Sequence, residues 1–399
     1  MKILRYRIRF LTPAFLGDAD QGGQWRTPPF KAQLRHWWRV AHAAGDGFRV
    51  DTAAAMRRKE GMLFGNAWLD EGSCQSLVQV RLSGWNTGKL TSWQGKEGAS
   101  IFHPEVKQTN YKVGPQAYLG YGPLDGRGGT RFAEKVKAAI APDENAVLSL
   151  RFPDEDEYAG EIMDALALMH AFGAVGGRSR NGWGAFSLSP EEDAPRPSTD
   201  MGRFFRPWQQ ALGQDWPHAL GEDKTGPLVW FTEPRADWKE VMRDLAIIKM
   251  GLRTQFVFEE RQGDQKKGRV MIHASPQARH WLAYPVTNHP VSSWDRRKLP
   301  WDDKISRLPN TIRFTARSAG NRRLRGVIFH VPCSPPREFS ADQNGLERIY
   351  GRVHQLLDEL TRPVRERRYE MITDKDDRRN KLRPQLDEIT IQRAEGGKV

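Results

Sequence analysis

The chain has 399 residues, of which 38% are hydrophobic and 28% charged, and its formal net charge at pH 7 is +13. A chain of this length exceeds a single ordinary hydrophobic core, so two domains are expected. No apolar run is long enough for a membrane helix, and residues 1–13 lack the continuous apolar stretch of a signal peptide. We therefore expect a cytoplasmic protein with no membrane segment.

The cysteine and histidine content argues against a metal centre. Cys74 and Cys333 are the two cysteines, too few for a disulfide framework or a zinc knuckle. The ten histidines are scattered and form no HExxH pattern. The sequence thus predicts no metal and no cofactor.

The positive charge favours a polyanionic partner. Lys and Arg number 62 against 49 Asp and Glu, and each phosphate that a basic side chain neutralises releases counterions. A basic protein with no such partner is the alternative, because net charge speaks to association and not to fold.

The first part of the chain predicts alternating strands and helices. Residues 2–10 alternate apolar side chains with arginines, which is typical of a strand. Thr27 as N-cap, followed by two prolines, predicts a helix to about residue 44. Residues 77–82 and 147–152 predict two strands on either side of a region rich in Gly, Trp and Tyr.

A second helix and a last strand complete this pattern. Apolar positions between residues 162 and 172 predict the helix, with Gly173 as a left-handed C-cap. Residues 185–188 predict the strand. The order strand, helix, strand, strand, helix, strand is that of ferredoxin-like domains such as RNA-recognition motifs. We therefore predict an N-terminal ferredoxin-like domain at residues 1–189 with an insertion at about 83–146.

The second part of the chain repeats the opening of this pattern. An acidic, proline-rich segment from residue 189 to 200 predicts a linker region at 190–225, before a C-terminal domain at 226–399. Strands are expected at 228–231, 311–315 and 324–331, and helices at 238–251 and after a capping box at 340–343. The predicted fold is α+β, with two ferredoxin-like (RRM-like) modules in tandem. Charge dominates from residue 365 to 399, so part of this tail is expected to be disordered.

Residues 173–186, GAVGGRSRNGWGAF, form the most distinctive stretch. The order helix, loop, strand and the missing lysine exclude a Walker loop or a dinucleotide loop. As a polynucleotide clamp, the glycines allow close backbone approach and Arg178 and Arg180 supply forked donors. Trp183 adds a face for base stacking. The alternative is a tight turn with two solvated arginines.

Two other basic segments are candidates for RNA contact. Lys31, Arg35 and Arg39 line one face of the first helix, where they either touch phosphates or form its ordinary polar side. Trp37 and Trp38 on that helix are expected in the core. Arg26, in the loop before the helix, is the better candidate for direct contact.

The hairpin at residues 313–325 carries five arginines around a Gly-Asn turn. Arg322, Arg323 and Arg325 form either a second RNA-contacting loop or a basic exposed hairpin. In the stretch 116–124, Tyr118 or Tyr121 either inserts between stacked bases or packs under a long loop.

For catalysis the sequence offers Asp18 and Asp20, in the loop after the first strand. A carboxylate there would serve attack by a ribose hydroxyl, whereas the alternative is an ordinary acidic loop. The histidines of the first helix, His36 and His42, have no identifiable acid–base partner.

Four segments, LTPAFLGDADQ, WRTPPFKAQLRHWWRVAHA, YLGYGP and GGRSRNGWGAF, occur in one order and spacing. In these segments the chain resembles the RAMP superfamily of CRISPR-associated proteins, and most closely the Cmr subunit numbered one of type III-B effector complexes. The resemblance is specific in the first part of the chain and weaker in the second.

The resemblance implies a non-catalytic RNA-binding subunit. Its partners would be the 3′ region of the guide RNA (crRNA), the target RNA and other subunits of the complex, in antiviral defence. The implied RNA-binding residues are Gly176, Gly177, Arg178, Arg180, Gly184, Arg26, Lys31, Arg35 and Arg39. The family often has Lys-Gly where this chain has Lys31-Ala32, so close backbone approach is not expected there. A ribonuclease acting from the Asp18 and Asp20 loop and a mainly structural capping subunit are the alternatives.

Overall fold

The computed structural model describes residues 1–18, 20, 22–49, 52–67, 72–93, 100–104, 112–126, 129–256, 265–268, 270–286, 288–294, 307–308, 310–369 and 378–398. These residues form a mixed α+β structure with small, mainly antiparallel sheets, which confirms the predicted α+β class. Over the described ranges, no helix has the length and apolar character needed to cross a membrane.

The first sheet contains four strands, β1 (Lys2–Phe10), β2 (Gln79–Leu82), β7 (Asn145–Phe152) and β8 (Phe186–Glu191). Their order is β2-β7-β1-β8 and every pairing is antiparallel. Along β1, Tyr6 and Ile8 are fully buried while Arg7 and Arg9 are exposed, as the alternating pattern predicts.

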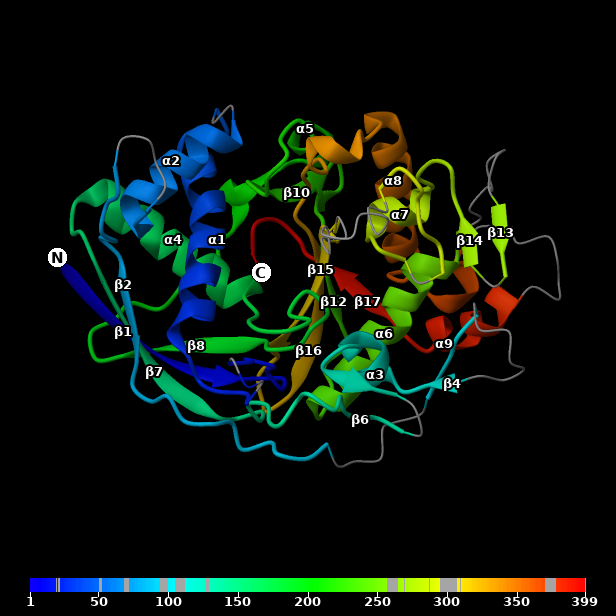
Figure 1. Cartoon of the computed structure of the whole chain (residues 1–399), viewed down its shortest axis with the longest axis horizontal. Coiled ribbons are helices and arrows are strands. Elements are labelled where there is room, and N and C mark those ends of the chain that lie inside the picture. Colours follow the sequence, from blue (N-terminus) through cyan, green and yellow to red (C-terminus); the bar gives the residue numbers. More distant parts are fainter. Residues whose placement is uncertain are drawn as a thin grey trace.

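One face of this sheet is covered by α1 (Thr27–Gly45) and α4 (Asp156–Phe172), as Figure 1 shows. Trp37 and Trp38 of α1 are 1% and 2% exposed, which confirms that both belong to the core. The helix begins one position earlier than predicted, because Arg26 is the N-cap and Thr27 the first helical residue. A further helix, α2 (Ala53–Phe64), packs against α1.

The predicted left-handed C-cap at Gly173 is wrong, because its φ is −68°. A Cβ atom at this position would nevertheless lie 2.2 Å from the carbonyl oxygen of Met169. Close packing, and not a left-handed backbone, therefore excludes a larger residue where α4 ends.

The segment between β2 and β7 holds short elements, namely β3 (Ile101–Phe102), β4 (Lys112–Val113), α3 (Pro115–Gly120), β5 (Leu124–Asp125) and β6 (Arg131–Phe132). The strands pair as two ribbons, β3 with β4 and β5 with β6. Helix α3 packs against α6 (Trp238–Thr254) from the later part of the chain.

The segment after β8 is also structured. It contains a 3-10 turn at Gly202–Phe204, β9 (Phe205–Pro207), α5 (Trp208–Ala211), β10 (Leu220–Asp223) and β11 (Gly226–Pro227). The three strands form a small sheet in the order β11-β10-β9.

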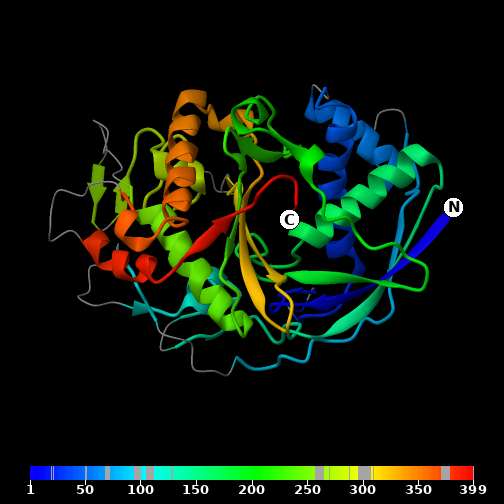
Figure 2. The ribbon, with the colours of Figure 1, turned by 180° about the vertical axis from the view of Figure 1, so that it is seen from behind.

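The second four-stranded sheet contains β12 (Val229–Thr232), β15 (Ile312–Ser318), β16 (Leu324–His330) and β17 (Ile391–Arg393). Its order is β15-β16-β12-β17, again antiparallel throughout. Helices α6 and α8 (Gln343–Glu359) lie on one side of it, as seen from behind in Figure 2. The remaining elements described are β13 (Gln265–Lys267), β14 (Val270–Ile272), α7 (Ala278–Leu282), α9 (Arg383–Asp387) and 3-10 turns at Arg337–Phe339, Val364–Glu366 and Arg378–Leu382.

The described residues form two hydrophobic cores, and the second sheet contributes to both. We call residues 2–191, built on the first sheet, the first half, and residues 229–393, built on the second sheet, the second half. The Phe329 ring of β16 lies 4.7 Å from that of Phe172 and 6.2 Å from that of Trp37, centroid to centroid. The second sheet therefore packs against α4 and α1 of the first half.

One prediction for the second half is wrong. Asp342, and not Ser340, is the N-cap of α8, and its carboxylate accepts from the backbone N–H groups of Asn344 and Gly345. In the tail, residues 378–398 contain α9 and β17, whereas residues 370–377 lie outside the described residues, so the expected disorder of part of the tail stays a prediction.

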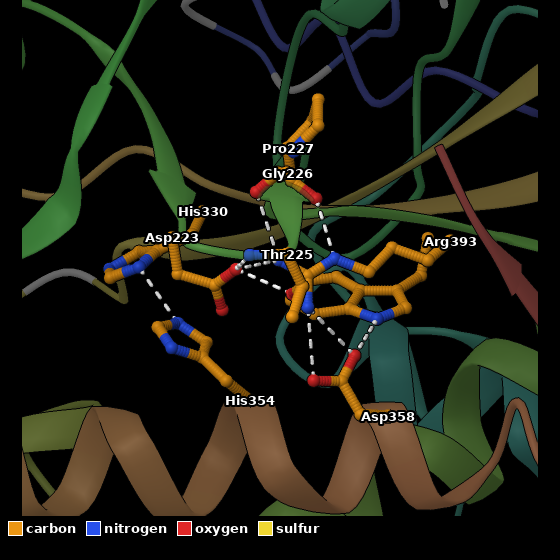
Figure 3. A network of polar contacts seen from close by, with 9 residues as sticks. Asp223, Thr225, Gly226, Pro227, His330, His354, Asp358 and Arg393 are labelled. Carbon is orange, nitrogen blue, oxygen red and sulfur yellow. Dashed lines mark hydrogen bonds and ion pairs between the residues drawn. The ribbon is translucent and has the colours of Figure 1, made fainter. Parts of the chain in front are cut away.

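Arg393 holds the end of β17 in place (Figure 3). Its guanidinium lies 2.6 Å from Asp223 of β10 and 3.0 Å from Asp358 of α8, and it donates to the carbonyl oxygens of Gly226 and Pro227. All three nitrogens of the Arg393 guanidinium have acceptors, and this side chain joins the charged tail to the rest of the fold.

Candidate nucleic-acid interface

The glycine-rich loop at residues 173–186 connects α4 to β8, and its glycines are fixed by packing within the protein. Gly184 has a φ of +66°, and a Cβ atom there would lie 1.9 Å from the carbonyl oxygen of Val175. Gly176 has a φ of +92°, and its Cβ would lie 2.7 Å from the carbonyl oxygen of Phe15. The N–H of Gly177 donates to that same oxygen. These glycines therefore shape the loop.

Trp183 does not offer a stacking face, because its side chain is fully buried. Its ring packs 5.1 Å from Phe15, 5.6 Å from Trp93 and 5.8 Å from Trp238, centroid to centroid. The prediction of base stacking by Trp183 is wrong, because this aromatic cluster joins the loop to α6.

Arg178 stands at a strained backbone position beside the YLGYGP segment. Its φ is +59°, a conformation that few residues other than glycine adopt. A Cβ atom at Gly122 would lie 3.4 Å from Nη2 of Arg178, so the guanidinium rests against the backbone there. Tyr121, next to it, is 65% exposed. Two segments that the sequence separates by more than fifty positions thus form one surface.

Among the residues that the structure describes, no acidic side chain pairs with Arg178. Among the described residues its guanidinium forms no ion pair and no hydrogen bond, and burial followed by the neighbouring Arg307 lowers its pKa. An arginine in this state has its donors available for an anion.

Lys249, on α6, approaches the same loop from the second half. Its Nζ donates to Oδ1 of Asn181 across 2.5 Å. Burial, followed by Arg253 and Arg178, lowers the pKa of Lys249 to about 7. The ammonium group has an amide partner but no carboxylate among the described residues.

Arg180, an exposed residue of the same loop, lies near Arg313 of β15. Burial lowers the pKa of Arg180, and among the described residues its side chain has no hydrogen-bond partner. Arg313 is 8% exposed, and burial followed by Arg180 lowers its pKa to about 9. Its Nη1 lies 2.5 Å from Nε2 of His36, whereas its buried Nε has no partner.

The loop is docked on β15 by backbone contacts. The N–H of Phe314 donates to the carbonyl oxygen of Arg180, and Asn181 forms a parallel bridge with Phe314. Arg317, also on β15, donates to the carbonyl oxygens of Ala171 and Phe186. Cations from both halves of the chain therefore surround the loop.

The basic residues of the first helix are engaged elsewhere in the first half. Arg35 and Arg39 both pair with Glu60 of α2, at 2.5 Å and 2.6 Å, and Glu60 is 2% exposed. Lys31 donates to Oγ of Ser76, and Arg26 donates to the carbonyl oxygen of Gly17. These four predicted contacts remain predictions, but their side chains are more constrained than those of Arg178 and Arg180.

The arginines of the predicted hairpin lie at the opposite end of β15 from Arg313. β15 and β16 form the expected antiparallel hairpin. The guanidinium carbon of Arg325 lies 4.1 Å from the ring centroid of Phe231, and Arg323 donates to the carbonyl oxygen of Pro234. Arg322 is exposed in the turn, with a φ of +59°.

Asp18 is part of a local turn. Its Oδ1 accepts from the backbone N–H groups of Asp20 and Gly22, at 3.0 Å and 2.6 Å. Asp20 is exposed. Over the residues that the structure describes, no three His, Cys, Asp or Glu side chains gather in a way that could hold a metal ion.

Sequence reasoning missed two of the cations around the loop, Lys249 and Arg313, and the contact of the neutral His36 with Arg313. Arg313 was visible as part of the arginine-rich hairpin, but alternation along a strand does not reveal which residue meets a distant loop. Lys249 lies on a helix that the sequence predicts from its apolar positions, and a single lysine on such a helix gives no indication of a functional role.

The comparisons with known proteins agree with the sequence motifs. Residues 7–187 match the family model described as the RAMP superfamily. A comparison with curated protein sequences found no match.

Solved structures of CRISPR proteins resemble the chain. Cmr1 from Pyrococcus furiosus, in its apo form, has 17% identity and a TM-score of 0.44, over 88% of this chain and 97% of that chain. A chain of the type III-B Cmr-beta complex bound to cognate target RNA has 10% identity and a TM-score of 0.45, over 88% and 99%. A chain of a type IV-B CRISPR complex has 15% identity and a TM-score of 0.30, over 49% and 93%.

The four sequence segments and the family model therefore point to one family, and the match confirms that residues 7–187 resemble the RAMP superfamily of CRISPR-associated proteins.

Proposed function

We propose that this protein is a non-catalytic RNA-binding subunit of a type III-B CRISPR effector complex in the cytoplasm. It contacts the 3′ region of the guide RNA and helps to capture target RNA. One observation carries the proposal: the cations around the glycine-rich loop, Arg178, Arg180, Lys249 and Arg313, have no carboxylate partner among the described residues.

The architecture that we propose consists of two ferredoxin-like modules, at residues 1–189 and 226–399, joined through residues 190–225. Each four-stranded sheet supports it. In the order of the chain, the strands of each sheet lie in space as second, third, first, fourth, and a helix follows the first and the third strand.

The contrast with other arginines of the same protein favours a polyanion as the ligand. Arg35 and Arg39 share Glu60, and Arg393 has Asp223 and Asp358. The chain thus provides carboxylates for these three arginines, and among the described residues it provides none for the loop cations. Phosphates would neutralise these cations and release counterions.

RNA is the polyanion that the family resemblance supports, through the four segments and the match over residues 7–187. The guanidinium of Arg178, at a strained backbone position, gives this surface hydrogen-bond donors for a phosphate. The exposed Tyr121 next to it gives an aromatic ring for an unpaired base.

The test is RNA binding by a loop variant and by a control of equal charge. Arg178→Ala with Arg180→Ala is compared with Arg81→Ala with Arg151→Ala, two exposed arginines on strands β2 and β7. Fluorescence anisotropy with a single-stranded RNA, over a series of salt concentrations, gives the affinity and its salt slope.

The loop variant is expected to bind more weakly and to reduce the salt slope by about 1.4, since each phosphate contact to a single strand contributes about 0.7. The control is expected to retain both. An unchanged affinity and slope in the loop variant would remove the basis of the proposal.

A mainly structural role is the second candidate, because the cluster of Phe15, Trp93, Trp183 and Trp238 shows how the insertion holds the two halves together. Nuclease treatment of the purified complex separates the two roles: contacts held by protein alone survive removal of the RNA, and contacts made through RNA do not.

A further inference from the structure

We propose that one phosphate of the bound RNA occupies the position between Arg180 and Arg313 and forms part of the interface between the two halves of the chain. RNA binding thereby stabilises the docking of the second half on the first. This inference rests on the proposed RNA-binding function and assigns a structural role to a single phosphate.

The two arginines come from opposite sides of the interface. Arg180 belongs to the glycine-rich loop of the first half, and Arg313 to β15, the edge strand of the second sheet. The backbone bond from Phe314 to Arg180 fixes the loop next to this strand. An anion held by both side chains would therefore bridge the halves.

Their hydrogen-bonding capacity is largely unused. A guanidinium carries five N–H donors, and for Arg313 one contact is seen, from Nη1 to His36. The buried Nε of Arg313 has no partner among the described residues. Arg180 is exposed, and its side chain has no partner there either. Buried donors are nearly always satisfied, so the unsatisfied Nε of Arg313 next to an available guanidinium points to a missing acceptor.

Arg317 gives a comparison on the same strand as Arg313. It is also buried, and its Nε and Nη1 donate to the carbonyl oxygens of Ala171 and Phe186, while its Nη2 has no partner among the described residues. Two of the three nitrogens of Arg317 thus have backbone acceptors, whereas Arg313 has one contact, with the His36 side chain.

The groups next to the pair add no negative charge. Burial raises the pKa of the Cys333 thiol to about 11, so the thiol is neutral. Burial, followed by Arg313, Arg180 and Arg39, holds the pKa of His36 well below its ordinary value, so His36 is neutral and its Nε2 accepts from Arg313. Asp215, which lies near Cys333, is exposed and forms no ion pair with either arginine.

A phosphodiester fits this position. The guanidinium groups of Arg180 and Arg313 can each donate two parallel hydrogen bonds to the oxygens of one phosphate. The neutral ring of His36 orients the guanidinium of Arg313. Without the anion, two like charges face each other across the interface, and burial leaves Arg313 cationic at neutral pH with a pKa of about 9. A ligand that binds only the docked form stabilises that form.

The experiment uses the full chain with Arg180→Gln, Arg313→Gln and the double variant, and Arg178→Gln as the matched loop variant outside the pair. Affinity for a single-stranded RNA is measured by anisotropy, and hydrogen exchange of β15 is measured with and without RNA. Arg313→Lys, which keeps the charge and removes the fork, replaces Arg313→Gln if the latter fails to fold.

Each single variant of the pair is expected to weaken binding about tenfold, as for a lost charge-assisted hydrogen bond. The double variant is expected to be little weaker than either single variant, because one shared phosphate is lost only once. RNA should slow exchange of β15 in the wild-type chain and in Arg178→Gln, but not in Arg313→Gln or Arg313→Lys.

Two results overturn the inference: multiplicative losses in the double variant, or RNA protection of β15 that persists without Arg313. If the wild-type chain binds no RNA, the proposed function itself is wrong. If Arg178→Gln weakens binding while the Arg313 variants do not, the function stands and this inference alone fails.

Discussion

Arg313 and His36, 277 positions apart in the sequence, are joined by a contact of 2.5 Å between Nη1 and Nε2. Because burial and three neighbouring arginines keep the pKa of His36 low, its ring accepts this proton without adding charge. The contact fixes the position of the buried guanidinium of Arg313 but does not neutralise its charge. Because His36 belongs to the first half and Arg313 to the second, the candidate RNA site lies at the boundary of the two halves.

The shape of the glycine-rich loop depends on Gly184. We expect Gly184→Ala to lower the free energy of unfolding by about 3 kcal/mol and to abolish RNA binding, because its Cβ would meet the carbonyl oxygen of Val175 at 1.9 Å and its φ is positive. Urea denaturation and anisotropy measure the two effects.

Gly320→Ala is the matched control for Gly184. Gly320 also has a positive φ, +78°, but open space surrounds the position of its Cβ. The control should cost about 1 kcal/mol, from backbone strain alone. Equal losses in the two variants would show that the contact with Val175 is unimportant.

Lys249 is expected to destabilise the folded protein, because burial disfavours its charged form. We expect Lys249→Met to raise the free energy of unfolding at pH 7 by about 2 kcal/mol, after allowance for its partial exposure, since burial lowers the folded pKa from 10.5 to about 7. The unfolded chain binds more protons between these two values. The gain is therefore complete below pH 7 and disappears as the pH approaches 10.5.

Urea denaturation at pH 7 and pH 10 measures this dependence, with Lys224→Met, at an exposed position, as the control. RNA affinity of Lys249→Met should fall, because a phosphate contact is lost. A stability gain that is the same at both pH values would contradict the assignment.

Glu60 holds Arg35 and Arg39. We expect Glu60→Gln to lower the free energy of unfolding by about 2 kcal/mol, because a nearly buried carboxylate with two cationic partners is removed. RNA affinity should be retained or increased, since two arginines are released. Glu192→Gln, which removes the exposed partner of Arg5, should cost well under 1 kcal/mol.

These measurements also decide the role of the first helix. If Glu60→Gln abolishes RNA binding in a folded protein, the helix face contacts RNA in the arrangement that Glu60 imposes.

Asp18 and Asp20 are expected to play no part in cutting RNA, because the Oδ1 atom of Asp18 is engaged by backbone N–H groups. Labelled guide and target RNA should remain intact with the purified chain, with and without magnesium. Discrete cuts that vanish in Asp18→Ala and Asp20→Ala would establish the ribonuclease alternative instead.

The sequence alone predicts most of the elements that carry the site. Alternation along residues 2–10, the apolar stripe containing Trp37 and Trp38, and the glycine-rich stretch between a helix and a strand depend on local periodicity and local backbone chemistry. Such patterns are readable in one segment at a time, and the structure has these elements where they are expected. The left-handed C-cap at Gly173 failed, because tertiary contacts and not the turn itself require that glycine.

What each cation does was decided by the tertiary structure. Arg35 and Arg178 are both arginines in basic segments, yet one meets Glu60 and the other meets no carboxylate among the described residues. Trp183 is a loop tryptophan in the sequence and a core residue in the fold. The hydrogen-bond partners and the protonation state of a side chain depend on its neighbours in space. Strand β15 and helix α6 pack against a loop of the first half, and this packing brings Arg313 close to Arg180 and Lys249 to Asn181.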